Sequence, residues 1–257
     1  MDLGLSGCRA LVTGASKGLG KACAKALTDE GARVFICARD PEGIERAAKE
    51  VGAAGWASAD VSSDTAVSEL VRDAVAQLGG LDILITNAGG PPTGFFENAT
   101  DADWDIGYQL TLMSAVRLIR ASLPALKASG RGRIINLTGF GVKEPPSDLS
   151  VSDSVRAAVS VMAKTVANDM APFGITVNNV APGPIRTDRL VELFTHRAAA
   201  AGITLEEQFS RFAATVPVRR VGEPEEVAGL CTYLCSLQAA YITGQSIVID
   251  GGINRSI

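Results

Sequence analysis

The sequence is poor in the residues that most often bind metal ions. It has one histidine, His196, and five cysteines in a chain of 257 residues. The cysteines are odd in number and lie inside apolar segments, so we expect reduced core residues of a cytoplasmic protein. Cys231 and Cys235 share a helix face, but His196 is distant in sequence. We therefore expect these two thiols to pack in the core, and we expect no metal site.

Long apolar runs and basic clusters are also missing. No stretch approaches the roughly 20 apolar residues that a membrane span requires, so we expect no membrane partner. The longest basic run is the pair Arg219–Arg220 and the net charge is −4, which argues against nucleic acid as a partner. The first expected strand begins about eight residues into the chain, too early for a signal peptide. This also favours the cytoplasm.

What the sequence contains is a regular alternation of apolar runs with helical segments. The runs that predict buried strands are 8–13, 33–38, 82–86, 133–138, 175–180 and 247–250, with a weaker one at 56–59. The helical patterns cover 18–31, 41–53, 64–79, 101–129, 150–173 and 224–236. This order predicts an α/β fold of Rossmann type, a doubly wound, seven-stranded parallel sheet with helices on both faces. No repeat or flexible linker divides the chain, so we expect residues 1–257 to form a single dinucleotide-binding domain.

One long irregular segment, at about 184–216, interrupts the alternation. It contains two helical pieces, 187–201 and 205–215, and several large apolar side chains such as Phe194, Phe209 and Phe212. Long insertions in compact domains are commonly lids or binding loops, so we expect a helical substrate lid. The alternative is that these side chains only hold the two helices down or face another subunit.

A glycine-rich loop follows the first expected strand. Thr13–Gly20 reads TGASKGLG, with Gly14, Gly18 and Gly20 spaced Gly-x-x-x-Gly-x-Gly. Glycine allows the sharp turn and lets a pyrophosphate approach the backbone, while the following helix offers free N–H groups. Because the loop stands between a strand and a helix, it predicts a dinucleotide site.

The end of the second expected strand indicates which dinucleotide binds. NAD-binding folds place an acidic residue there, about twenty residues after the glycines. Here Ala38 and Arg39 occupy the strand end, and Lys17 in the glycine loop adds a second cation. These cations suit the 2′-phosphate of NADP. Asp40 would repel that phosphate if it pointed inward, so NAD stays open.

With these motifs in place, the chain resembles the short-chain dehydrogenase/reductases from about residue 7 to residue 252. Further matching motifs are Asp60-Val61, Asn87-Ala88-Gly89, Pro182–Thr187 (PGPIRT), Thr243–Gln245 and Asp250–Gly252. The likeness is clearest to the 3-oxoacyl-acyl carrier protein reductase branch, in Gly174–Gly183 and Pro217–Val227. The resemblance implies a cofactor site formed by Gly14, Ser16, Lys17, Gly18, Leu19, Gly20, Arg39, Asp60, Val61, Asn87, Ala88, Gly89, Arg156, Pro182, Gly183, Ile185 and Thr187.

The catalytic positions depart from the family pattern. The family uses a Tyr-x-x-x-Lys pair, a serine after the fifth strand and an asparagine on the preceding long helix. Counted from the flanking motifs, these positions hold Ser152, Arg156, Gly139 and Thr111. No shift of the alignment produces a Tyr-x-x-x-Lys pair. The chain has three tyrosines, Tyr108, Tyr233 and Tyr241, and the residues four positions after them are Leu112, Leu237 and Gln245.

Several residues are candidates to replace the missing chemistry. Ser152 and Arg156 share a helix face, so Arg156 can hold the nicotinamide ribose as the lysine would. Ser152 is a poor acid, because an alkyl hydroxyl has a pKa several units above the value of about 10 for tyrosine. Tyr108 is a better acid, unless it packs at a helix or subunit contact. Thr138 and the loop residues Lys143 and Asp148 are further candidates.

These substitutions leave three hypotheses open. The chain is an NADPH-dependent carbonyl reductase with another proton donor, a nucleotide-binding protein with a different chemistry, or an inactive structural subunit. The lid favours a hydrophobic or acyl small-molecule substrate. The resemblance also implies a homotetramer or homodimer, with helices 101–129 and 150–173 at one interface and the C-terminal strand at another.

Overall fold

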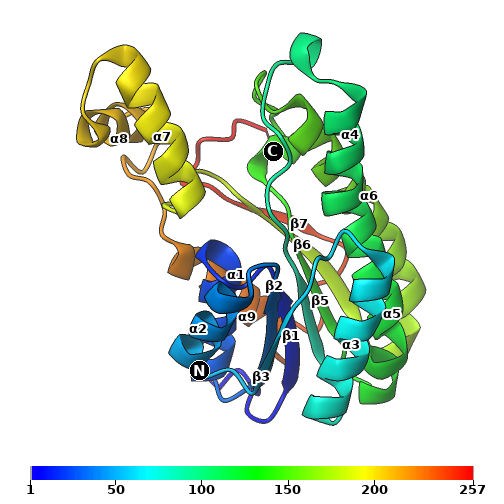
Figure 1. Ribbon diagram of the computed structural model, residues 1–257. Coiled ribbons are helices and arrows are strands. Elements are labelled where there is room, and N and C mark those ends of the chain that lie inside the picture. Colours follow the sequence, from blue (N-terminus) through cyan, green and yellow to red (C-terminus); the bar gives the residue numbers. More distant parts are fainter. Residues whose placement is uncertain (1, 257) are drawn as a thin grey trace.

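A parallel sheet of seven strands forms the centre of the computed structural model, which describes residues 2–256 (Figure 1). The strand order is β3-β2-β1-β4-β5-β6-β7, and every adjacent pair is parallel. The strands are β1 (Arg9–Thr13), β2 (Arg33–Ala38), β3 (Gly55–Ser58), β4 (Ile83–Thr86), β5 (Arg133–Leu137), β6 (Thr176–Pro182) and β7 (Ser246–Ile249). The predicted doubly wound Rossmann-type fold is confirmed.

Helices cover both faces of this sheet. One face carries α1 (Gly18–Asp29), α2 (Pro41–Val51) and α9 (Pro224–Cys235), and the other carries α3 (Asp64–Leu78), α5 (Ser114–Ser129) and α6 (Ser150–Met170) (Figure 1). Side-chain caps define several helix starts, because they satisfy backbone N–H groups that lack a partner in the helix. Ser63 caps α3 in this way, and Asp40 caps α2.

The predicted helix 101–129 is not uniform. It consists of α4 (Asp101–Gly107), a wider π-helical turn η2 (Tyr108–Met113) and α5. Such wide turns within α-helices occur frequently at functional sites. The predicted helix 150–173 likewise ends at Met170 and continues as a 3-10 turn, Ala171–Phe173.

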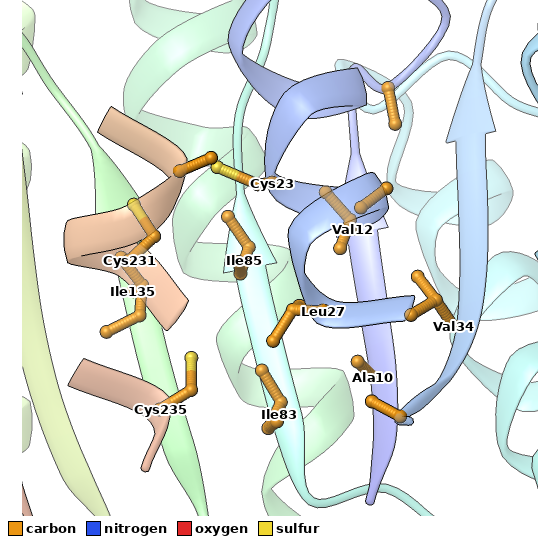
Figure 2. Close-up of a cluster of buried hydrophobic side chains, with 14 of the residues drawn as sticks. Ala10, Val12, Cys23, Leu27, Val34, Ile83, Ile85, Ile135, Cys231 and Cys235 are labelled. Atoms are coloured by element: carbon orange, nitrogen blue, oxygen red, sulfur yellow. The ribbon is translucent and has the colours of Figure 1, made fainter. Parts of the chain in front are cut away.

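The core lies in two layers, one on each face of the sheet. In the layer shown in Figure 2, Cys23 of α1 and Cys231 and Cys235 of α9 pack beside the sheet with Ile85 and Ile135. All five cysteines are buried free thiols, and burial raises the pKa of Cys235. Within residues 2–256, no three His, Cys, Asp or Glu side chains are grouped so that they could hold a metal ion. No helix in this range is long and apolar enough to cross a membrane.

The segment predicted as a lid forms two helices, α7 (Asp188–Ala201) and α8 (Leu205–Ala213). They pack against each other through Phe194 and Phe209, whose ring centroids are 4.8 Å apart. Figure 1 shows this pair standing away from the sheet, on the side where the strands end and across from α4. The carboxyl ends of the strands and these two helices therefore border the same region, where doubly wound folds bind their ligands.

Candidate functional site

The glycine loop connects β1 to α1 and requires glycine at two positions for a steric reason. Gly14 has a positive φ of 60°, and a β-carbon at Gly20 would lie 2.4 Å from the carbonyl oxygen of Gly14. Lys17 precedes α1 in an extended conformation, and among the described residues no side chain caps this helix. The first N–H groups of α1 therefore face outward, as a site for phosphate requires.

Asn87 joins the glycine loop to the end of β4. Its amide Nδ2 donates to the Gly14 carbonyl oxygen at 3.1 Å, and its backbone N–H donates to Thr13 Oγ1 at 2.9 Å. The Thr13 hydroxyl in turn donates to the Asn87 carbonyl oxygen at 2.7 Å. This two-way link fixes the loops after β1 and β4 relative to each other, so Asn87 has a structural role beside its predicted ribose contact.

A cavity of about 860 Å³ opens between these loops and α7. Its size lies in the range of cofactor and substrate pockets. Most of the predicted cofactor residues line it, namely Gly14, Ser16, Lys17, Gly18, Leu19, Arg39, Val61, Asn87, Ala88, Gly89, Arg156 and Thr187. The other five predicted cofactor residues are not among the described residues that line it, and one of them, Ile185, is buried in the core. These five are Gly20, Asp60, Pro182, Gly183 and Ile185.

Basic side chains gather in this cavity where β2 ends. Arg39 and Arg46 line it there, and Lys17 lines it from the glycine loop. Asp40, whose charge was a concern, caps α2 by accepting a hydrogen bond from Gly43 N–H at 3.1 Å. Arg46 was missed in the sequence. The sequence does place Arg46 three residues after Gly43, and this spacing puts both residues on the same side of α2, the side that lines the cavity.

Asp60 follows β3 and is held by its own turn. Its Oδ1 accepts hydrogen bonds from the backbone and the hydroxyl of Ser62, at 3.0 and 2.8 Å. Burial raises the pKa of Asp60, but these hydrogen bonds and the charge of Arg39 outweigh burial, so the pKa is lowered overall. The carboxylate is therefore ionised and oriented next to Val61, which lines the cavity.

Arg156 reaches from α6 to the end of β5. Its Nη1 donates to the Thr138 carbonyl oxygen at 2.6 Å, and its Nε donates to Ser152 Oγ at 3.2 Å. Burial, followed by the nearby charge of Arg189, lowers the pKa of Arg156 to about 10, so the group stays protonated at neutral pH. The structure thus brings Ser152, Arg156 and Gly139 together. Thr138 lies beside them, but its hydroxyl is engaged with the Val180 carbonyl oxygen at 3.2 Å.

A second, inner cavity of about 20 Å³ lies behind Arg156 and is bordered by Thr111 of η2. The Oγ1 of Thr111 is buried and has no hydrogen-bond partner among the described residues. A volume of this size accommodates about one water molecule, and an unpaired hydroxyl is the kind of group that binds one. The π-helical turn thus places Thr111 on the same small cavity as Arg156.

The remaining sequence candidates lie farther out. Tyr108 begins η2 and is 43% exposed, and it belongs to the lining of neither cavity in the described chain. Lys143 is exposed, and Asp148 accepts from Arg197 of α7 at 3.0 Å. These positions favour a surface role for Tyr108 and a contact between loop and lid for Asp148.

Sequence reasoning missed two charged residues of this region. Asp153 follows Ser152 on α6 and is only 6% exposed, and its Oδ2 has no hydrogen-bond partner within residues 2–256. Burial raises the pKa of Asp153 to about 6. Arg189, in the first turn of α7, lines the large cavity and donates to the Pro91 carbonyl oxygen at 3.3 Å.

Comparison with known proteins agrees with this geometry. A family model described as enoyl-(acyl carrier protein) reductase matches residues 14–254. Nodulation protein G of Rhizobium sp. (strain N33) is 37% identical, over 97% of this chain and 98% of the relative. The 3-oxoacyl-[acyl-carrier-protein] reductase of Vibrio cholerae is 32% identical, over 98% of this chain and 99% of the relative.

Among solved structures, L-sorbose reductase from Gluconobacter frateurii, complexed with NADPH and L-sorbose, superimposes with a TM-score of 0.96. It is 30% identical, and the match covers 100% of both chains. The strand order, the glycine loop and these full-length matches lead to one conclusion. The chain belongs to the short-chain dehydrogenase/reductase family of NAD(P)-dependent oxidoreductases.

Proposed function

We propose that the protein is an NADPH-dependent reductase of a carbonyl substrate that obtains its proton from a source other than the family tyrosine. The observation that carries the cofactor choice is the pair of cations where β2 ends, Arg39 and Arg46, with Asp40 turned into the cap of α2. Lys17 adds a cation from the glycine loop, where it lies 3.7 Å from Asp188. A 2′-phosphate is dianionic and matches these cations, whereas NADH offers them only a hydroxyl.

NADPH, when bound, supplies a hydride to the carbonyl carbon of the substrate. The chain provides the orientation: the uncapped start of α1 holds the pyrophosphate, and Asn87 to Gly89 border the ribose. Arg156 places a positive charge beside the oxygen that becomes negative during hydride transfer. A preoriented charge in a site that excludes water stabilises such an oxygen strongly.

The proton comes from a water molecule that occupies the inner cavity beside Thr111. One O–H bond of this water breaks as the O–H bond of the product alcohol forms, and the resulting hydroxide regains a proton from solvent. We assign this role to water rather than to Ser152, because the Ser152 hydroxyl is already engaged by Arg156 Nε, and a hydroxide left by water is replenished from solvent without reprotonating a side chain. We propose a hydrophobic or acyl substrate from the similarity to 3-oxoacyl reductases alone, because the apolar side chains of α7 and α8 pack against each other and the α7 residues that line the cavity are Asp188 and Arg189.

Titration with NADPH and NADH, followed by nicotinamide fluorescence, tests the cofactor choice. We expect NADPH to bind more tightly, and Arg39→Ala to weaken NADPH roughly tenfold or more while leaving NADH nearly unchanged, because one charge-assisted contact is lost. Arg72→Ala, on the exposed side of α3, is the matched control. Equal binding of the two dinucleotides by the wild type would contradict the proposal.

Oxidation of NADPH by a panel of 3-oxoacyl thioesters, 2-oxo acids and simple ketones then tests the activity. Turnover that is lost in Arg156→Ala but survives in Ser152→Ala supports reduction without the serine as donor. Binding of NADPH without turnover of any ketone would favour an inactive subunit instead.

A homotetramer or homodimer is also proposed. Val161 of α6 is 71% exposed and Phe173, just beyond this helix, is 45% exposed, although both are large apolar residues. A second copy packed on this face would bury them. Light scattering tests this, and a mass of 26.6 kDa would overturn it.

A further inference from the structure

The large cavity carries more positive charge than a dinucleotide accounts for. Its lining includes six basic side chains and two acidic ones. The basic residues are Lys17, Lys21, Arg39, Arg46, Arg156 and Arg189, and the acidic ones are Asp40 and Asp188. The first four basic residues come from the glycine loop, the start of α1 and the β2–α2 corner, where the phosphates of the proposed cofactor are expected.

Arg156 and Arg189 lie elsewhere in the cavity. Arg156 is tied to the end of β5 through the Thr138 carbonyl oxygen, and Arg189 to the segment after β4 through the Pro91 carbonyl oxygen. This is the end that the proposed function assigns to the nicotinamide and the substrate. The nicotinamide ring carries no phosphate, so the cofactor leaves these two guanidinium groups without an anionic partner.

The protein gives these two arginines no close ion pair: Asp153 attracts Arg156 and Glu192 attracts Arg189, but only over longer distances. No ion pair shorter than 4.0 Å joins Arg156 or Arg189 to a carboxylate of residues 2–256. The two charges also repel each other, since Arg189 is one of the groups that lower the pKa of Arg156. Two cations that line one cavity without a close ion pair cost free energy, and an anionic ligand between them recovers part of it.

The backbone makes room for Arg189 at this place. A β-carbon at Gly90 would lie 1.0 Å from Arg189 Nη1, so any residue larger than glycine would displace the guanidinium. The group therefore lies against the loop after β4, and within residues 2–256 its one side-chain hydrogen bond is that from Nη2 to the Pro91 carbonyl oxygen, which leaves its other N–H donors without a partner. A guanidinium in this position can bind both oxygens of a carboxylate at once.

We propose that the substrate carries a carboxylate next to its reacting carbonyl, and that Arg189 binds this carboxylate while Arg156 lies beside the carbonyl oxygen. The inference rests on the proposed carbonyl reductase function and narrows the substrate class to 2-oxo acids. The cofactor pyrophosphate offers the same anionic chemistry, so the experiment has to separate the two sources.

Benzoylformate and acetophenone form a suitable pair of probes, because they differ only in a carboxylate replaced by a methyl group. Binding of each to the protein loaded with NADP⁺ is measured by calorimetry, without turnover. We expect benzoylformate to bind at least about tenfold more tightly, the effect of one charge-assisted, bidentate contact. Equal affinities would overturn the proposal.

Three variants locate the effect. Arg189→Ala removes the preference for benzoylformate and leaves NADPH affinity within about twofold of the wild type, since the lost contact is to substrate alone. Arg189→Lys keeps the positive charge but loses the paired N–H donors of the guanidinium, so it should retain part of the preference for benzoylformate over acetophenone. Arg211→Ala, an exposed arginine of α8, removes the same charge from the lid and leaves the preference unchanged.

The opposite pattern identifies the pyrophosphate as the anion. If Arg189→Ala weakens NADPH and leaves the affinity for benzoylformate unchanged, the proposal is wrong. Failure of the underlying activity gives a different result: benzoylformate binds through Arg189, but NADPH is not oxidised by it. That outcome would support the anion site and overturn the reductase function.

Discussion

The Cδ of Arg156 lies 3.5 Å from the position that a β-carbon would take at Gly139. Counted from the flanking motifs, we predict that these two residues stand at the positions of the family lysine and serine. A β-carbon at Gly139 would be in ordinary van der Waals contact with the Arg156 side chain, whose Nη1 donates to the Leu137 and Thr138 carbonyl oxygens. The end of β5 and the middle of α6 are thus in direct contact at these two positions.

Replacing Arg156 tests whether it holds the cofactor. We expect Arg156→Ala to weaken NADPH binding by about 1–3 kcal/mol, the typical contribution of a hydrogen bond to a charged group. Arg156→Lys should lose less, because it keeps the charge near the ribose. Both affinities are measured by fluorescence titration, with thermal melts to verify folding. Unchanged affinity in a folded Arg156→Ala protein would remove Arg156 from the cofactor site.

The glycine loop supplies a second prediction. Gly20→Ala places a β-carbon 2.4 Å from the Gly14 carbonyl oxygen and 2.9 Å from Asn87 Nδ2. Overpacking of this kind costs about 1–3 kcal/mol, so Tm should fall by several degrees and NADPH affinity should fall with it.

Gly229→Ala is the matched control. Gly229 is an exposed residue inside α9, and a β-carbon there meets nothing within 4 Å among the described atoms. Alanine favours the helix by up to about 1 kcal/mol, so this variant should melt at the same or a higher temperature than the wild type. Similar melting temperatures for the two variants would show that the loop tolerates a side chain.

The fold and the cofactor loop were predictable because their signals are local. The spacing of Gly14, Gly18 and Gly20 and the apolar runs of the strands appear directly in the sequence. Strand and helix ends were predicted within a few residues. The observed ends differ from the predicted ones where a capping residue or a wider helical turn sets the boundary. The π-helical turn at Tyr108–Met113 has the same apolar pattern as a regular helix, so its wider winding was not evident.

Asp153 and Arg189 were missed for a different reason. Ser152 and Asp153 are neighbours on α6 and both are buried, and only the packing of that helix decides that it is Asp153 that lies against Gly141. The Arg189 guanidinium can lie against the loop after β4 because residue 90, about a hundred positions earlier in the chain, is a glycine and has no side chain there. Relationships of this kind join distant segments, and no pattern within either segment reports them.

The buried carboxyl of Asp153 predicts a pH dependence of stability. Burial raises its pKa from the ordinary value of 3.8 to about 6, so between these values the folded protein holds a proton that the unfolded chain releases. Stability from this group is fully present below pH 3.8 and is lost as the pH rises through about 6. Two pKa units correspond to about 3 kcal/mol. Asp153→Asn cannot ionise, so it should lose this dependence.

Urea unfolding at pH 4 and pH 7 measures the effect. Relative to the wild type, Asp153→Asn should gain about 2–3 kcal/mol on going from the lower to the higher pH. Asp169→Asn, an exposed carboxyl of the same helix, should show no such difference. If the two variants respond alike, the prediction is wrong. The Asp153 carboxylate is then either hydrated in solution or stabilised by the charge of Arg156 enough to cancel the effect of burial.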